Sequence, residues 1–246
     1  MILTDIQQYE IYYCKHDFNY FVENYCYNFV KYLNTKEPYN IQDYYPECLK
    51  SIATDKISLW WSSIQLGMTT FLVLFSLWKI LFNDNIHIGI KISKLSYAND
   101  FIMKIIEQYK TFPDFLKSDR KITKDIINMN NGSSIRIYSS NTSIGFRFNY
   151  MITEVYDLSN HMLYNTIDEL YDQLMRGCKL IINGYADPYR IDENIIFMED
   201  MQYDDRIDAL MLPWYKISER NDFWKQDQID KLGITNFNIY YELTRN

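Results

Sequence analysis

The chain has 246 residues, of which 48% are hydrophobic and 23% charged, a composition typical of a globular protein rather than a disordered one. Its net charge of −7 and its scattered basic residues do not support a free-standing binder of duplex DNA, which needs a basic face to neutralise phosphates. The four cysteines and three histidines lack the spacing of a structural zinc site or a disulfide framework, and the longest apolar stretch, Phe71 to Phe82, is too short to span a bilayer.

The N-terminal segment, residues 1–35, is predicted to be helical. Aromatic residues from Tyr20 to Tyr32 recur at three- and four-residue intervals, which is the spacing of one apolar helical face. Residues 43–50 can begin another helix, because a proline such as Pro46 is tolerated in a first turn.

The pattern changes after residue 56. We predict a strand at Ile57 to Trp61, a polar turn at residues 62–67 and a long apolar helix from Thr69 to Phe82. A second strand is predicted at Ile86 to Ile90 and a second helix at Ser96 to Lys110. Strand, turn, helix, strand and helix is the rhythm of a parallel sheet, so the predicted fold class is α/β.

The second half of the chain continues this mixture. The turn signal Asn131-Gly132 predicts a hairpin between strands at residues 125–129 and 134–138. Further strands are predicted at residues 147–153, 179–182, 194–198 and 209–215, and helices at residues 163–175 and 222–241, the last one broken at Gly233.

The segment from residue 59 to residue 70 has the layout of a phosphate loop: an apolar strand, a turn with Gly67, the paired hydroxyls Thr69 and Thr70, and a helix. In such loops, backbone N–H groups face the phosphates, one hydroxyl binds Mg²⁺ and a basic side chain neutralises charge. Met68 stands where that basic residue is usually found. The alternative is an ordinary strand-turn-helix crossover in which polar turn residues cap the helix.

Other segments resemble, in the same order, motifs of the ATPase domain of tailed-phage large terminases. The family's loop has the form S-R-Q-x-G-x-T-T, and this chain has Ser63-Ile-Gln-Leu-Gly-Met-Thr-Thr70. Further short segments resemble the family at residues 19–25, 43–45, 112–116, 131–135, 150–154, 179–183, 220–224 and 241–242. The resemblance extends over residues 17 to 242 and rests on this collinearity, because no single match is specific.

The resemblance implies a P-loop NTPase-like fold of the RecA/ASCE type, a mostly parallel sheet flanked by helices, with a helical N-terminal arm. Residues 1–56 would form that arm together with a degenerate adenine motif, and residues 57–246 the ATPase core. Large terminases continue into a nuclease domain built on a carboxylate–metal cluster. No acidic run after Glu242 can supply that cluster, so we expect the nuclease domain to be absent.

The chain departs from the family at the positions that handle the nucleotide. Ile64 replaces the loop arginine, Met68 the frequent lysine and Tyr45 the glutamine that contacts adenine. Thr153 replaces the first acidic residue of the Walker B motif, which orders Mg²⁺. The coupling motif, usually rich in threonine, reads Asn183-Gly-Tyr185.

The residues retained from the family are Gln65, Gly67, Thr69 and Thr70 in the loop, and Glu154 at the position of the catalytic carboxylate. Losing two cations and one carboxylate removes several charge-assisted contacts of roughly 1.5–3 kcal/mol each, so nucleotide affinity should fall by orders of magnitude. We predict no metal site, and we expect ATP and Mg²⁺ as cofactors only if this vestigial site still binds them. In the alternative interpretation, Glu154 is an ordinary exposed residue at a strand end.

The leading hypothesis is therefore a phage or mobile-element protein, impaired in ATP hydrolysis, that acts through protein contacts in viral DNA packaging in the host cytoplasm. The expected partner is an intact terminase subunit, the portal or another packaging component, and a homo-oligomer is left open. DNA contact lacks support from charge, and no membrane contact is expected.

Two alternatives remain. In the first, the chain is an active, divergent ATPase whose site is completed in trans by Arg120, Arg136 or Arg147 of a neighbouring subunit. In the second, the chain is a structural or inhibitory protein that reuses the fold. In the second case Tyr45, Ile64 and Met68 would fill the old nucleotide pocket.

Overall fold

The computed structural model describes residues 3–30, 35–92, 95–117, 120–123, 126–138, 146–155, 158–185 and 189–244. The chain forms two compact units that alternate along the sequence. The first unit comprises residues 1–41, 69–90 and 94–138, and the second comprises residues 42–68, 91–93 and 139–246.

Helices of the first unit begin and end at recognisable signals. They are α1 (Asp5–His16), α2 (Phe18–Tyr25), α4 (Met68–Phe82) and α5 (Leu95–Thr111), followed by a short 3-10 turn, η1 (Asp114–Leu116). A capping box formed by Thr4 and Gln7 starts α1. The indole of Trp78 donates to the carbonyl of Cys14 at 2.7 Å and so joins α4 to α1.

The prediction that residues 1–35 are helical is wrong at residues 27–30 and at Thr35, whereas residues 31–34 lie outside the described residues. The chain extends at Cys26, and β1 (Tyr27–Val30) pairs antiparallel with β2 (Thr35–Pro38). Aromatic and β-branched residues fit a strand as well as they fit a helical face, so the periodicity alone did not find this boundary.

The strands of the first unit are β4 (His87–Ile92), β5 (Arg120–Ile122), β6 (Ile126–Met129) and β7 (Ser134–Ile137). Strand β4 pairs parallel with β7, whereas β7, β6 and β5 pair antiparallel. The hairpin predicted at Asn131-Gly132 is thereby confirmed. Gly132 has a φ of 82°, and a Cβ atom there would lie 2.3 Å from Asn85 Oδ1, so only glycine fits this turn.

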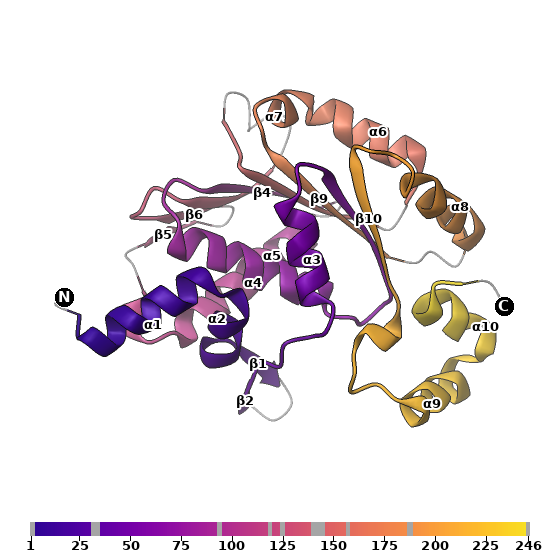
Figure 1. The fold of residues 1–246 in the computed structure, drawn as a ribbon, viewed down its shortest axis with the longest axis horizontal. Helices are drawn as coiled ribbons and strands as arrows, with labels where there is room; N and C mark the ends of the chain where they lie inside the picture. The colour runs from indigo at the N-terminus through magenta and orange to yellow at the C-terminus, as the bar shows by residue number, and fades with distance from the viewer. Residues whose placement is uncertain are drawn as a thin grey trace. The chain divides into compact units, whose positions relative to one another are not determined.

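The strands of the second unit are β3 (Ile57–Ser62), β8 (Tyr150–Val155), β9 (Lys179–Tyr185) and β10 (Ile207–Leu212). Their order is β10-β3-β9-β8, and all neighbours are parallel. Leu59, Trp60 and Trp61 are fully buried, because strands of a parallel sheet are covered on both faces. The strands of the first unit have the order β4-β7-β6-β5, and the parallel pairs of both units confirm a mostly parallel α/β fold (Figure 1).

The second unit also contains most of the shorter helices. They are α3 (Tyr45–Ala53), α6 (Asn160–Glu169), α7 (Tyr171–Met175), α8 (Ile191–Met201), the 3-10 turn η2 (Trp214–Lys216), α9 (Asp222–Leu232), α10 (Ile234–Phe237) and a π-helical turn, η3 (Asn238–Glu242). The C-terminal helical segment from α9 onward is drawn in yellow in Figure 1. Its predicted break at Gly233 is confirmed, with a φ of 80° there.

Two sequence predictions in this unit are wrong. Residues 194–198 lie in α8, not in a strand, because Asn194, Phe197, Met198 and Met201 are buried at helical spacing. The single helix predicted at residues 163–175 is divided into α6 and α7 at Leu170, whose ψ of 8° leaves the helical region while its side chain is fully buried.

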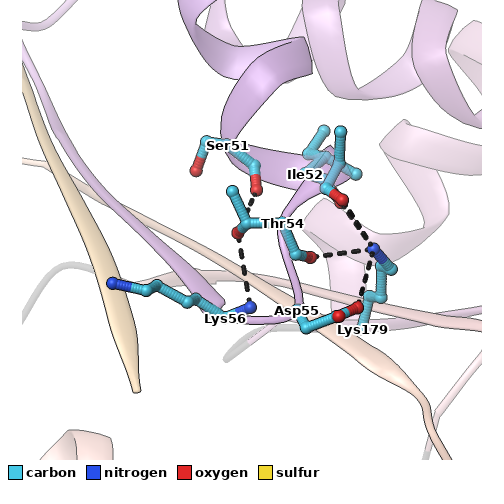
Figure 2. A network of polar contacts seen from close by, with 7 residues as sticks. Ser51, Ile52, Thr54, Asp55, Lys56 and Lys179 are labelled. Atoms are coloured by element: carbon cyan, nitrogen blue, oxygen red, sulfur yellow. Dashed lines mark hydrogen bonds and ion pairs between the residues drawn. The ribbon is translucent and has the colours of Figure 1, made fainter. Parts of the chain in front are cut away.

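Helix α3 is attached to strand β9 by Lys179. Its ammonium group donates to the carbonyls of Ile52, Ala53 and Thr54 at 3.1, 3.2 and 2.8 Å, and it lies 3.9 Å from a carboxylate oxygen of Asp55 (Figure 2). The last carbonyls of a helix have no partner within the helix, and a lysine can supply one. This contact fixes the C-terminal end of the helix whose N-terminal end reaches the loop described below.

None of the helices in the part of the chain that the structure describes is long and apolar enough to cross a membrane.

Candidate functional site

The loop of residues 63–68 connects β3 to α4 and is held by main-chain contacts at its start. Ser63 N–H donates to the carbonyl of Leu212 at 2.9 Å, and Ile64 N–H donates to that of Tyr240 at 3.1 Å. Gln65 and Gly67 both have left-handed backbone conformations, with φ of 58° and 93°. Such a conformation is uncommon for glutamine, so the surrounding contacts must stabilise it.

Three side chains from other parts of the second unit donate hydrogen bonds to oxygen atoms of the loop. Tyr44, just before α3, donates its hydroxyl to the carbonyl of Leu66 at 3.0 Å. Arg220 donates from Nη2 to the carbonyl of Gln65 at 2.6 Å, and the hydroxyl of Tyr241 donates to Gln65 Oε1 at 3.2 Å. The segment after β10 therefore contacts the loop through both side-chain and main-chain atoms.

The structure shows where Ile64, Met68 and Tyr45 lie, the uncharged residues interpreted from the sequence as substitutions. Ile64 packs against a cluster of Trp214, Phe237 and Tyr241 from the C-terminal segment. Met68 is 1% exposed. Tyr45 is fully buried, with its ring edge-to-face to that of Tyr44 at 5.0 Å.

Glu154 lies near the carboxyl end of β8, where both it and Thr153 are buried. Tyr185 donates its hydroxyl to Glu154 Oε1 at 2.7 Å. The interpretation of Glu154 as an exposed strand-end residue is therefore wrong. Its neighbour Thr153 has a neutral side chain.

Strand β9 connects these residues to the strand that precedes the loop. Ser62 donates its hydroxyl to Asn183 Oδ1 at 2.9 Å and also lies 3.3 Å from the carbonyl of Gly184. Asn183 is the register partner of Glu154 on β8. The carboxyl ends of β3, β9 and β8 thus meet at one edge, which is where open α/β sheets bind ligands.

Two of the retained residues, Thr69 and Thr70, form the first turn of α4 and are partly exposed, as are Gln65 and Gly67 of the loop. In the described ranges no group of three or more His, Cys, Asp and Glu side chains is arranged to hold a metal ion. Of the arginines considered for action in trans, Arg147 donates to the carbonyl of Arg176 at 2.8 Å and Arg120 lies 4.0 Å from the ring centre of Tyr109; Arg136 lies on β7.

The sequence motifs include Tyr44, Tyr185, Arg220 and Tyr241 but did not indicate the contacts that these residues make at the site. Tyr44 bonds to the loop across 22 residues of sequence, and Arg220 and Tyr241 do so across 155 and 176 residues. No local motif carries a contact over such distances, although Arg220 and Tyr241 do lie in segments that resemble the family.

No family model matches the sequence. The structure, however, is similar to the large terminase of bacteriophage HK97, with a TM-score of 0.68 and 12% identity over 94% of this chain and 55% of that protein. The fold is that of a large-terminase ATPase domain. The ATPase domain of the Thermus phage P74-26 large terminase has the same fold, with a TM-score of 0.57 and 10% identity over 85% of this chain and 95% of that domain.

A third terminase, from a thermophilic bacteriophage and in complex with ADP, gives a TM-score of 0.60 and 12% identity over 83% of this chain and 53% of its own length. The chain thus spans about half the length of two of these large terminases. The resemblance inferred from short motifs is confirmed at the level of the terminase ATPase fold.

Proposed function

We propose that this chain is a component of phage DNA packaging that has the terminase ATPase fold, is impaired in ATP hydrolysis and acts through protein contacts. The observation that carries the proposal is the buried pair Thr153 and Glu154, which presents one carboxylate where the family has two acidic residues. The loop residues Ile64 and Met68 also supply no positive charge.

The chemistry explains why these losses matter for hydrolysis. Phosphoryl transfer depends on positioning and on stabilising charge that spreads over the phosphoryl oxygens, and Mg²⁺ provides much of that stabilisation. Glu154 can accept a proton or orient a water, but it already accepts a hydrogen bond from Tyr185. A neutral threonine beside it lacks the negative charge that an acidic residue would offer to the metal ion.

Hydrolysis of Mg²⁺–ATP by the purified full chain tests this proposal. We expect a rate that does not change in Glu154→Gln or in the control Glu193→Gln, which removes an exposed carboxylate on α8. ATP hydrolysis that is abolished by Glu154→Gln and kept by Glu193→Gln contradicts the impaired-ATPase proposal.

The same assay examines completion of the site in trans. An active divergent ATPase that needs a neighbouring subunit should show a specific rate that rises with protein concentration. When Arg120, Arg136 or Arg147 is replaced by alanine in a fraction of the subunits, the specific rate should no longer rise with protein concentration. Adding the chain to a defined packaging reaction then tests the role in packaging, since a partner of the motor changes the packaging rate without hydrolysing ATP itself.

A further inference from the structure

Exposed apolar side chains gather on the helices that follow β8 and β9. Tyr164 of α6, Tyr171 and Met175 of α7 and Ile196 of α8 are all at least 44% exposed, and Tyr203, in the turn after α8, is 87% exposed. Single exposed apolar residues are common on protein surfaces, but a group of them on neighbouring elements with a polar rim is typical of a contact surface.

These helices cover one face of the four-stranded sheet of the second unit. Strand β8 leads through α6 and α7 to β9, and β9 leads through α8 to β10, so both connections cross the sheet β10-β3-β9-β8 in the same direction. Right-handed crossovers in one direction place their helices on one face, and Figure 1 shows α6 and α8 on the same side of this sheet. Hydrogen bonds to Asp204 and Tyr164 raise the pKa of Arg206, so Tyr164 of α6 lies close to the turn that follows α8.

Carboxylates surround the exposed apolar residues. On α8, Glu193, Ile196 and Asp200 are spaced by three and four residues and therefore share one face of the helix. All three are exposed, whereas Phe197 and Met198 on the opposite side of the helix are buried. The acidic residues of this rim that are exposed and form no ion pair with a described residue are Asp168, Asp172, Glu193, Glu199, Asp200 and Asp205.

The negative charge of the chain is concentrated in the same region. Residues 157–208 contain twelve Asp and Glu but four Lys and Arg, a net charge of −8, whereas the whole chain carries −7. Helix α9 provides a contrast: it also exposes an aromatic side chain, Phe223, but its lysines Lys225 and Lys231 form ion pairs with Glu242 and Asp227. The surface of α6, α7 and α8 thus combines exposed apolar groups with an uncompensated negative charge.

This charge decides which partner the surface can bind. The phosphates of a nucleic acid or of an anionic lipid would lie against carboxylates and be repelled, and so would the same face of a second copy of the chain. A protein segment that carries lysine or arginine beside apolar residues has the complementary charge and also buries the exposed apolar area.

We propose that the outer face of α6, α7 and α8 binds a basic segment of a partner protein, in which lysine and arginine side chains flank apolar residues. Ile196 and Tyr203 provide the apolar contact, and Glu193 and Asp200 provide the charge. The inference rests on the part of the proposed function that assigns action through protein contacts, and it names the surface and the chemistry of the partner. It holds whether or not ATP is hydrolysed.

Fluorescence anisotropy of a labelled, synthetic amphipathic peptide of leucine and lysine, titrated with the full chain at physiological salt, tests this assignment. We expect the wild type to bind this peptide and not the corresponding peptide of leucine and glutamate. Replacing Ile196 and Tyr203 together with serine should weaken binding about ten-fold, because the apolar contact is lost. The matched control is Phe223→Ser, which removes an aromatic side chain with the same 87% exposure as Tyr203 and should leave binding unchanged.

A pair of charge-reversed variants separates the local charge from the net charge. Glu193→Lys with Asp200→Lys should weaken binding about ten-fold. Glu23→Lys with Glu107→Lys alters the net charge equally, at exposed positions of α2 and α5, and should weaken it less than about two-fold because salt screens distant charges.

The inference is overturned if the wild type does not bind the leucine–lysine peptide or binds the leucine–glutamate peptide equally well. It is also overturned if either control weakens binding as much as the variant that it matches. Because none of these measurements involves nucleotide, a failure here is distinct from a failure of the impaired-ATPase proposal, which the hydrolysis assay decides.

Discussion

Replacing Lys179 with methionine should detach the C-terminal end of α3 from β9. The ammonium group donates to three carbonyls, and a hydrogen bond to a charged group contributes about 1.5–3 kcal/mol. The Lys179 side chain is 30% exposed, so water can reach the carbonyls once the ammonium is gone. We therefore expect the free energy of unfolding to fall by about 2 kcal/mol, close to the value of one such bond.

Urea denaturation of the wild type and Lys179→Met measures this difference, and a decrease in midpoint at constant slope identifies a loss of stability. In thermal melts the same loss corresponds to a decrease in Tm of about 4–8 °C for a chain of this size. Lys231→Met is the control, because its ion pair with Asp227 is more than half exposed and should contribute less than about 0.5 kcal/mol. Equal effects of the two substitutions would refute the role assigned to Lys179.

Three further predictions concern the loop and the surface. Tyr44→Phe should lower the free energy of unfolding by about 1–2 kcal/mol in urea titrations, because the carbonyl of Leu66 loses its donor; an unchanged midpoint would contradict this. Ile64→Ala should destabilise by about 1–2 kcal/mol, less than a fully buried residue, and should change the tryptophan fluorescence of Trp214, which it packs against. Hydrogen bonds from Arg206 lower the pKa of Asp204 from 3.8 to about 2, so the stability it contributes is present above pH about 4 and is lost as the pH falls toward 2. Asp204→Asn should therefore reduce the loss of stability over that pH range, and a curve parallel to that of the wild type would exclude the ion pair as its cause.

Local sequence patterns predicted much of the fold, because strands, turns and helices depend largely on residues that are close in the sequence. The run Ile57 to Trp61, its polar turn and the apolar helix after it became β3, the loop and α4. The turn Asn131-Gly132 predicted its hairpin because few other sequences adopt that turn. Periodicity failed where the same spacing of residues fits both a helix and a strand. Residues 27–30 form a strand although their aromatic spacing continues that of α2. It failed again at residues 194–198, where the apolar run after Asn194 lies in a helix, because a short apolar run fits a strand and a buried helix equally well.

The candidate site was predictable only in part. Sequence motifs located the loop and Glu154, since each lies at the end of a strand that is itself local in sequence. The contacts that set the state of the loop come from Tyr44, Arg220 and Tyr241, which are brought to it by the tertiary fold. A substitution such as Ile64 therefore looked like a simple loss of charge, whereas in the structure its side chain packs against the C-terminal aromatic cluster.

Binding and hydrolysis make different demands on this site, and that difference separates the three functional hypotheses. Arg220 supplies a positive charge beside the loop through its hydrogen bond to the carbonyl of Gln65. It cannot supply the negative charge that an acidic residue at the position of Thr153 would offer to Mg²⁺, because a guanidinium is a cation and Mg²⁺ is bound by oxygen ligands. An active ATPase needs both functions and a passive scaffold needs neither. A chain that is inactive toward Mg²⁺–ATP and yet changes the rate of a packaging reaction would instead be the hydrolysis-impaired component proposed above. In such a protein, Thr153→Asp should raise the affinity for Mg²⁺–ATP above that of the wild type in a calorimetric titration, because a second carboxylate then lies beside Glu154.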